Sequence, residues 1–357
     1  MHLVVLTQVL DRQDAVLGFF HTWCHLFARH VTRLTVVAQQ VGQVDLPDNA
    51  TVVSLGRERG AGRLGMWWRL TRTLHRLKGK DAPDAILAHM VPRFALSAAP
   101  QARARGIPLY LWYTHKGVDR SLRMAVTLVK KGFTASAESF RLETEETEVV
   151  VTGHGVDARH FHFGDDPRPV DVVAVGRLSP TKGQDELVEA LARLDPVPVT
   201  EIAGDVLLEQ DVPWREALRR RADEVGAGRI TLLGAVPNPA VADVLRRARV
   251  LVSTSRTGSV DKAVLEAMAT GTLPLTCNES FGPIFGPDLA SRLMYAPGDL
   301  DQLVTRLDAL LALPADEAEL LGRRLRTKVL VDHDVLDLIP RLVSGMRPAG
   351  RVAAARA

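Results

Sequence analysis

The sequence predicts an α/β protein built from two doubly wound domains. Short β-branched runs alternate with segments of helical period almost throughout the chain, which is typical of a parallel sheet covered by helices on both faces. The alternation stops at an acidic link that contains two prolines, residues 164–169, and then starts again. We therefore expect two lobes with a ligand cleft between them.

In the first half the expected elements alternate strictly. Strands are predicted at His2–Thr7, Leu34–Ala38, Thr51–Leu55, Ala85–His89, Leu109–Tyr113 and Glu148–Thr152. Helices are predicted at Leu17–Ala28, Met66–Leu77, Arg93–Arg105 and Leu122–Lys130.

The second half repeats the pattern. Strands are predicted at Val170–Val175, Val197–Ala203, Ile230–Leu233, Val250–Ser253 and Leu273–Thr276, and helices at Gln184–Leu194, Trp214–Val225, Pro239–Ala248 and Asp261–Ala269. We place the domains at residues 1–162 and 163–330. A helix over 331–345 is expected to pack back on the first domain, and residues 346–357 are expected to be a frayed tail.

Composition indicates a globular protein without a membrane-spanning segment. The chain has 357 residues, of which 46% are apolar and 24% charged, as in ordinary soluble domains. Cys24 and Cys277 lie far apart, which favours a reducing compartment. Residues 1–7 are interpreted as a strand rather than a signal peptide. Because no apolar run approaches about 18 residues, we expect a cytoplasmic protein.

The net charge of +3 is unevenly distributed. Between Arg57 and Lys80 all charged side chains except Glu58 are basic. A helical stripe of leucines runs through this stretch, with Trp67 near its start and basic side chains on another side, Arg69, Arg72 and Arg76. Two interpretations remain open: an amphipathic helix with a solvated face, or docking on an anionic membrane, to which each basic group contributes about 1 kcal/mol.

Two motifs in the second half carry the chemistry. The first is a buried-strand run that ends at Gly176 and is followed by Arg177 and Lys182, just before a helix. Ligands collect at the carboxyl ends of parallel strands. Both cations suit phosphate oxygens, and they could stabilise a departing diphosphate. An ordinary solvated loop is the alternative, and the spacing alone does not decide between the two.

The second motif runs from Gly258 to Gly271. Gly258 and Ser259 precede a helix whose first amides would be free to bind an anion. Glu266 lies on the apolar part of that helix, where a carboxylate needs a partner such as a ribose diol. Alternatively, Glu266 pairs with Lys262 in a surface ion pair contributing about 0.5 kcal/mol or less.

These motifs resemble glycosyltransferase family 4, a family of retaining enzymes with the GT-B fold, in which two Rossmann-like domains face a cleft. Gly176–Gly183 is similar to its Gly-Arg-Leu-x-x-x-Lys-Gly motif, and Leu265–Gly271 to its Leu-Glu-Ala-Met-Ala-x-Gly motif. The resemblance implies that Arg177 and Lys182 hold the donor diphosphate and that Glu266 binds the ribose. It also implies that the segment around Gly234 and Val236 meets the nucleobase.

The sequence departs from the family at one position. Where the family carries a sugar-contacting glutamate eight residues before the ribose-binding one, this chain has Gly258. It therefore looks like a variant subgroup in which Ser259, Asp261 or Lys262 could contact the donor. In the first lobe, Gly18 resembles the family's phosphate-approaching glycine loop. His115 matches its active-site histidine, which we expect to act near the donor sugar; the alternative is a histidine satisfied at a strand end. For His89, also at a strand end, the sequence leaves both interpretations open.

The function expected from this resemblance is transfer of a hexose from a UDP- or GDP-linked sugar to a glycan or lipid-linked acceptor in cell-envelope polysaccharide synthesis. No cofactor, metal or nucleic acid is expected, because the nucleotide sugar is a co-substrate and no side chains show metal-ligand spacing. A nucleotide-sugar epimerase and a non-catalytic nucleotide- or glycan-binding subunit are the alternatives. An epimerase would need an acid/base pair that acts on the sugar. A non-catalytic subunit remains an alternative because Gly258 stands where the family has a glutamate that contacts the sugar.

Overall fold

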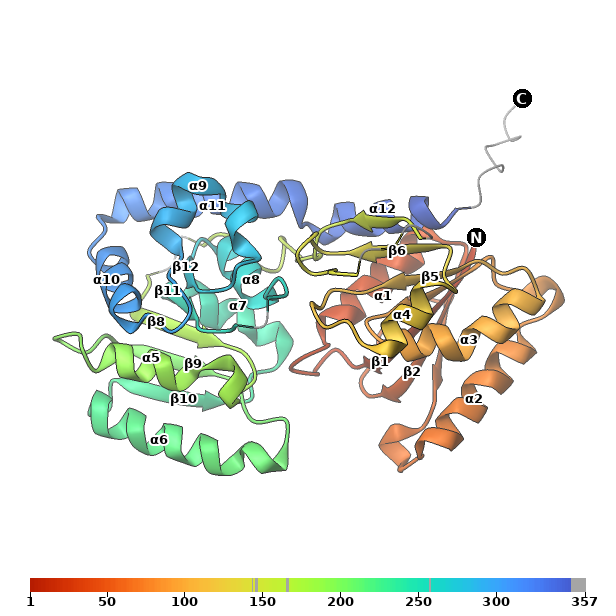
Figure 1. Ribbon diagram of the computed structural model, residues 1–357, viewed down its shortest axis with the longest axis horizontal. Helices are drawn as coiled ribbons and strands as arrows, with labels where there is room; N and C mark the ends of the chain where they lie inside the picture. Colours follow the sequence, from red (N-terminus) through yellow and green to blue (C-terminus); the bar gives the residue numbers. More distant parts are fainter. Residues whose placement is uncertain (143, 145–146, 165–166, 257, 348–357) are drawn as a thin grey trace. The chain divides into compact units, whose positions relative to one another are not determined.

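The chain forms two compact units in a computed structural model that describes residues 1–142, 144, 147–164, 167–256 and 258–347 (Figure 1). The N-terminal unit comprises Met1–Arg12, Phe19–Gly153 and the described residues 336–347, and the C-terminal unit comprises Gln13–Gly18 and His154–Val335. Part of the expected link, residues 165–166, and most of the expected tail, residues 348–357, lie outside the described residues.

The N-terminal unit is built on a parallel sheet in the order β3-β2-β1-β4-β5-β6-β7. Its strands are β1 His2–Leu10, β2 Arg33–Val41, β3 Ala50–Ser54, β4 Ala85–His89, β5 Leu109–Trp112, β6 Lys131–Thr134 and β7 Val149–Val151. Its helices are α1 Phe19–His30, α2 Arg63–Arg76, α3 Pro92–Ala104, α4 Arg120–Val126 and α12 Val335–Met346, with 3-10 turns η1 Arg57–Arg59 and η2 Gly79–Asp81.

The C-terminal unit is built on a second parallel sheet in the order β10-β9-β8-β11-β12. Its strands are β8 Val170–Val175, β9 Thr200–Ala203, β10 Ile230–Gly234, β11 Ala248–Ser253 and β12 Leu273–Thr276. Its helices are α5 Gln184–Leu191, α6 Val212–Gly226, α7 Asn238–Arg246, α8 Lys262–Thr270, α9 Phe281–Leu293, α10 Leu300–Leu311 and α11 Ala315–Asp332, with η3 Pro180–Lys182 and η4 Glu209–Asp211.

Helix α8 is the element that positions the second motif. Every residue of it from Ala263 to Thr270 is buried, so it lies inside the unit, between α7 and α11 (Figure 1). Its C-terminal cap is Gly271, with φ at +76°. A Cβ at Gly271 would lie 2.2 Å from the Phe163 ring, and one at Gly322 of α11 would lie 2.8 Å from the Gly271 carbonyl. Close glycine packing therefore holds α8 against α11.

Helix α12 belongs to the N-terminal unit, although it follows the C-terminal unit in sequence. The Tyr110 hydroxyl of β5 donates to the Met346 carbonyl at 3.1 Å. A Cβ at Gly345 would lie 3.0 Å from the Phe133 ring of β6, so this end of α12 lies close to the sheet. No helix of the described chain is both long and apolar enough to cross a lipid bilayer.

Candidate functional site

Three glycines form a bare backbone ledge at the carboxyl ends of β8, β9 and β10. The Gly176 amide donates to the Ala203 carbonyl at 2.9 Å, and the Gly204 amide donates to the Gly234 carbonyl at 2.8 Å. A Cβ at Gly204 would lie 1.9 Å from the Gly176 carbonyl oxygen, so only glycine permits this approach. A hollow of about 140 Å³ opens here, with Gly176, Gly204 and Val236 among its lining residues.

The two predicted diphosphate cations follow this ledge. Arg177 is exposed and lines the same hollow, and its carbonyl accepts a hydrogen bond from the Gln184 side chain at 3.0 Å. Lys182 ends η3, and its carbonyl accepts from the Thr254 hydroxyl at 2.6 Å. Gly183 then takes the left-handed conformation, with φ at +66°, and starts α5. The loop is thus fastened to the end of β11, with the Lys182 side chain 22% exposed.

Asp261 is the side chain that Lys182 contacts. Its carboxylate accepts from the Lys182 ammonium at 3.1 Å and from the Ser253 hydroxyl at 3.3 Å, and it caps α8 by accepting from the Ala263 amide at 3.3 Å. Burial alone would raise the pKa of Asp261, but the charge and hydrogen bond of Lys182, together with the hydrogen bonds from Ala263 and Ser253, outweigh burial and hold that pKa below its usual value. The prediction that the first amides of α8 are free is therefore wrong for Ala263.

Glu266 lies one turn further along α8 and is paired with Lys262. The i,i+4 pairing considered from the sequence is present, but the pair is buried rather than at the surface: the Glu266 and Lys262 side chains are 5% and 15% exposed. Burial raises the pKa of Glu266, and the charge of Lys262 offsets only part of that rise. The Lys262 ammonium also lies 5.5 Å from the centre of the Phe161 ring, a favourable cation–π contact.

The loop that replaces the family's glutamate is fixed by backbone contacts. The Gly258 carbonyl accepts from the Ser280 hydroxyl at 2.7 Å, and the Ser259 carbonyl accepts from the Asn278 amide at 2.6 Å. Gly258 has φ at +64°, a conformation in which a side chain is strained. A glutamate at this position would not fit the present backbone without strain. The Ser259 hydroxyl oxygen is buried and has no hydrogen-bond partner among the residues that the structure describes.

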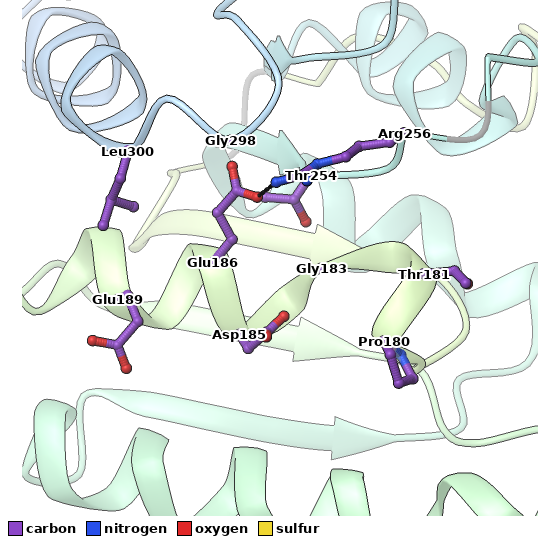
Figure 2. Close-up of a pocket in the computed structure, with 10 residues that line it drawn as sticks. All are labelled: Pro180, Thr181, Gly183, Asp185, Glu186, Glu189, Thr254, Arg256, Gly298 and Leu300. Atoms are coloured by element: carbon purple, nitrogen blue, oxygen red, sulfur yellow. Dashed lines mark hydrogen bonds and ion pairs between the residues drawn. The ribbon is translucent and has the colours of Figure 1, made fainter.

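A larger hollow, of about 650 Å³, lies where the loop that contains η3 leads into α5 (Figure 2). Asp185, Glu186 and Glu189 of α5 line it, and Arg256 reaches across to form an ion pair with Glu186. Glu186 pairs with Arg256 and Glu189 pairs with Arg221, so Asp185 leaves this wall net negative, which disfavours a diphosphate. The larger hollow is therefore a poorer candidate for the donor than the ledge beside Arg177.

His154, between β7 and β8, was not among the site residues predicted from the sequence. It is buried, and its backbone amide donates to the His333 ring at 3.3 Å. Burial, with a smaller contribution from the Lys262 charge, lowers the pKa of His154 to about 3. The glycines on either side of it, Gly153 and Gly155, mark a tight turn, but nothing in the sequence signals that it lies close enough to Lys262 to sense its charge.

This buried histidine predicts an acid-sensitive unit. The unfolded chain takes up a proton near pH 6.5, whereas folded His154 does so only near pH 3, so the free energy of unfolding should fall as pH drops between those values. His154→Asn should flatten that dependence between pH 7 and pH 5, measured as the urea midpoint of the C-terminal unit. The exposed His162→Asn should leave the slope of the wild type unchanged, and an unchanged slope in His154→Asn would contradict the assignment.

The predicted residues of the first part of the chain lie in different settings. His115 is an exposed residue after β5, and its Nδ1 accepts from the Gly117 amide at 2.9 Å. Gly18 is buried just before α1, in the short segment that groups with the C-terminal unit. His89, whose role the sequence left open, is stacked on Phe20 at 3.7 Å and hydrogen-bonded to Thr7. It is a core residue.

Both motifs lie within one segment that matches a family model. Residues 156–327 match the model described as "Glycosyl transferases group 1". The match takes in the glycine ledge, both predicted diphosphate cations and all of α8. A comparison with curated proteins found no match for this chain.

Solved structures share the fold over nearly the whole chain. HepE of Anabaena, in complex with UDP and glucose, is 17% identical in sequence and has a TM-score of 0.77. The match covers 97% of this chain and 99% of the HepE chain. Sucrose-phosphate synthase of Thermosynechococcus elongatus is 16% identical with a TM-score of 0.75, at 96% and 98% coverage. The lipopolysaccharide outer core galactosyltransferase WaaB is 15% identical with a TM-score of 0.64, at 97% and 99%. The chain has the GT-B fold.

Proposed function

We propose that the protein is a retaining glycosyltransferase that moves a hexose from a nucleoside-diphosphate sugar to a glycan or lipid-linked acceptor. One observation carries the proposal. Lys182, the start of α8 and buried Glu266 follow the carboxyl ends of β8 and β11, within the segment that matches group 1 glycosyltransferases. This edge of a parallel sheet is where such folds bind nucleotides.

In the proposed reaction the bond between the sugar's anomeric carbon and the diphosphate breaks, and the acceptor oxygen bonds to that carbon on the same face. The acceptor proton passes to the departing diphosphate. Arg177 and Lys182 offset the charge that develops on the diphosphate, Glu266 accepts from the ribose hydroxyls, and Gly234–Val236 meets the base. His115 acts at the donor sugar. With these cations in place no metal is required, so turnover in EDTA should equal that in Mg²⁺.

The donor is the first point to test. HepE was solved with UDP and with UDP-glucose, which supports a uridine nucleotide, while a guanine nucleotide remains the alternative. Calorimetry with UDP and GDP separates them, and hydrolysis of a panel of UDP- and GDP-sugars tests the class of activity. Sugar inversion without transfer would favour an epimerase, and binding without turnover would favour a non-catalytic subunit.

We further propose that α2 docks the enzyme on the inner face of an anionic membrane, where a lipid-linked acceptor for envelope polysaccharide would lie. Leu64, Trp67 and Trp68 are 84%, 51% and 53% exposed on α2, and the Arg72 guanidinium lies 5.0 Å from the centre of the Trp68 ring. Exposed aromatic groups beside basic groups suit a lipid headgroup region. Arg69 also donates to the Leu55 carbonyl at 2.9 Å, so it ties α2 to the end of β3.

Charge reversal on α2 should release the protein from anionic vesicles. The double variant Arg72→Glu/Arg76→Glu leaves Arg69 in place and changes the surface charge by four units, which should weaken binding by about a hundredfold or more. Sedimentation with vesicles containing phosphatidylglycerol measures this. Arg93→Glu/Arg103→Glu on α3 of the same unit is the matched control and should bind like the wild type. Equal loss in both double variants would mean that α2 is not the docking element.

A further inference from the structure

The Asp261 carboxylate is bound to Lys182, one of the two cations that the proposed function assigns to the donor diphosphate. It accepts from the Lys182 ammonium at 3.1 Å, from the Ser253 hydroxyl at 3.3 Å and, as the cap of α8, from the Ala263 amide at 3.3 Å. A cation, a hydroxyl and an amide at a helix start are what a phosphate oxygen would use. One carboxylate of the chain itself already satisfies all three.

This carboxylate is held in place and charged. Its side chain is 12% exposed, and Lys182, the cation opposite it, is 22% exposed. The interaction joins residues 79 positions apart, so it fastens the η3 loop to the start of α8. Lys262 and Glu266 form a neighbouring ion pair, which is also largely buried. The unit therefore holds two of its proposed donor-binding side chains in ion pairs of its own.

We propose, on the basis of the proposed function, that Asp261 is an internal competitor for the donor diphosphate. When the donor binds, the ion pair between Lys182 and Asp261 has to break, and the diphosphate then lies beside the Asp261 carboxylate as a second anion. Asp261 therefore lowers the affinity of the site for any diphosphate. Asp261 also makes the contacts to base and ribose decide which ligand binds. An anion without them gains little binding energy, because the Asp261 carboxylate already accepts the hydrogen bonds that the site offers.

Competition and a positioning role for Asp261 can be told apart by the charge balance of the site. The side chains Arg177, Lys182 and Lys262 bring three positive charges, and Asp261 and Glu266 bring two negative ones, so the site is only weakly positive. A neutral residue at position 261 would free Lys182 and add one unit of positive charge to the site. If Asp261 instead served mainly to orient Lys182, the same change would weaken diphosphate binding. The two roles thus predict opposite signs.

Asp261→Asn is a suitable test because asparagine caps a helix as well as aspartate does, so only the charge is removed. Asp299→Asn is the matched control: Asp299 caps α10 of the same unit by accepting from the Gln302 amide. Asp261→Ser, which also caps, is the second variant in case the first does not fold. Calorimetry with UDP, GDP and inorganic pyrophosphate compares the variants with the wild type.

We expect Asp261→Asn to bind all the diphosphates that the wild type binds at least tenfold more tightly, and to bind pyrophosphate measurably, with Asp299→Asn unchanged. If the wild type binds UDP or GDP tightly and Asp261→Asn binds it equally or more weakly, Asp261 is not a competitor. The proposed function would still stand. Tighter pyrophosphate binding with no preference for either nucleotide would support the competitor and count against the nucleotide-sugar function. No diphosphate binding by any of the proteins would overturn both.

Discussion

Lys182→Ala lowers kcat by about 10²–10³-fold, the cost of removing one charged group that stabilises a developing negative charge. The effect falls on kcat more than on donor KM, because the leaving diphosphate carries more charge in the transition state than in the bound donor. Steady-state transfer, or donor hydrolysis where no acceptor is known, measures it. Turnover within twofold of the wild type would remove Lys182 from the proposed chemistry.

A structural role of Lys182 can be separated from a catalytic one. The single change leaves Asp261, whose side chain is 12% exposed, without its cation, and breaking such a pair costs stability. The double variant Lys182→Ala/Asp261→Asn removes both charges, so its Tm should recover while its turnover stays low. Arg256→Ala is the control for general loss of positive charge, because Arg256 pairs with Glu186 in the larger hollow. It should retain nearly full turnover.

Glu266→Gln weakens binding of a nucleoside diphosphate by about tenfold to a hundredfold, because the ribose hydroxyls lose a charged acceptor, typically about 1.5–3 kcal/mol. Pyrophosphate has no ribose, so in the Asp261→Asn background, where its binding is expected to be measurable, Glu266→Gln should not weaken it. Calorimetry with both ligands gives this difference, and a general collapse of the site would weaken both.

The matched control for this change is Glu319→Gln. Glu319 forms an i,i+4 ion pair with Arg323 on α11, as Glu266 does with Lys262 on α8, but its side chain is 53% exposed. An exposed pair of this kind contributes about 0.3–0.5 kcal/mol, so the control should change neither stability nor nucleotide binding appreciably. If both glutamine variants bound UDP like the wild type, the ribose role of Glu266 would have to be abandoned.

The sequence predicts elements best where burial dictates the residue type. Ala85–His89, Val170–Val175 and Leu273–Thr276 form strands with the predicted bounds, because each is a buried run between turn residues. β6 was missed: its four residues, Lys131–Thr134, include a glycine and show no long apolar run. The strand predicted from Val197 begins only at Thr200, after Pro198, which has no amide to donate.

The site was predictable in part. Arg177, Lys182 and Glu266 stand in recognisable motifs; in the structure Arg177 and Lys182 follow β8 and Glu266 lies on α8, after β11, while their roles toward a donor stay predictions. The pairing of Lys182 with Asp261 could not be predicted, because it joins two loops 79 residues apart and depends on how β8 and β11 pair. The burial of the Lys262–Glu266 pair was equally hidden, since an i,i+4 spacing looks the same on an exposed helix.

Hydrogen–deuterium exchange with and without the nucleoside diphosphate that calorimetry selects tests the central claim most directly, because it needs no variant and no acceptor. The account predicts slower exchange in two segments of the C-terminal unit, residues 176–184 and 258–268, with the glycine ledge at Gly204 and Gly234 protected as well. Protection confined to the acidic hollow around Glu189 and Leu300, or no protection in the C-terminal unit, would contradict it.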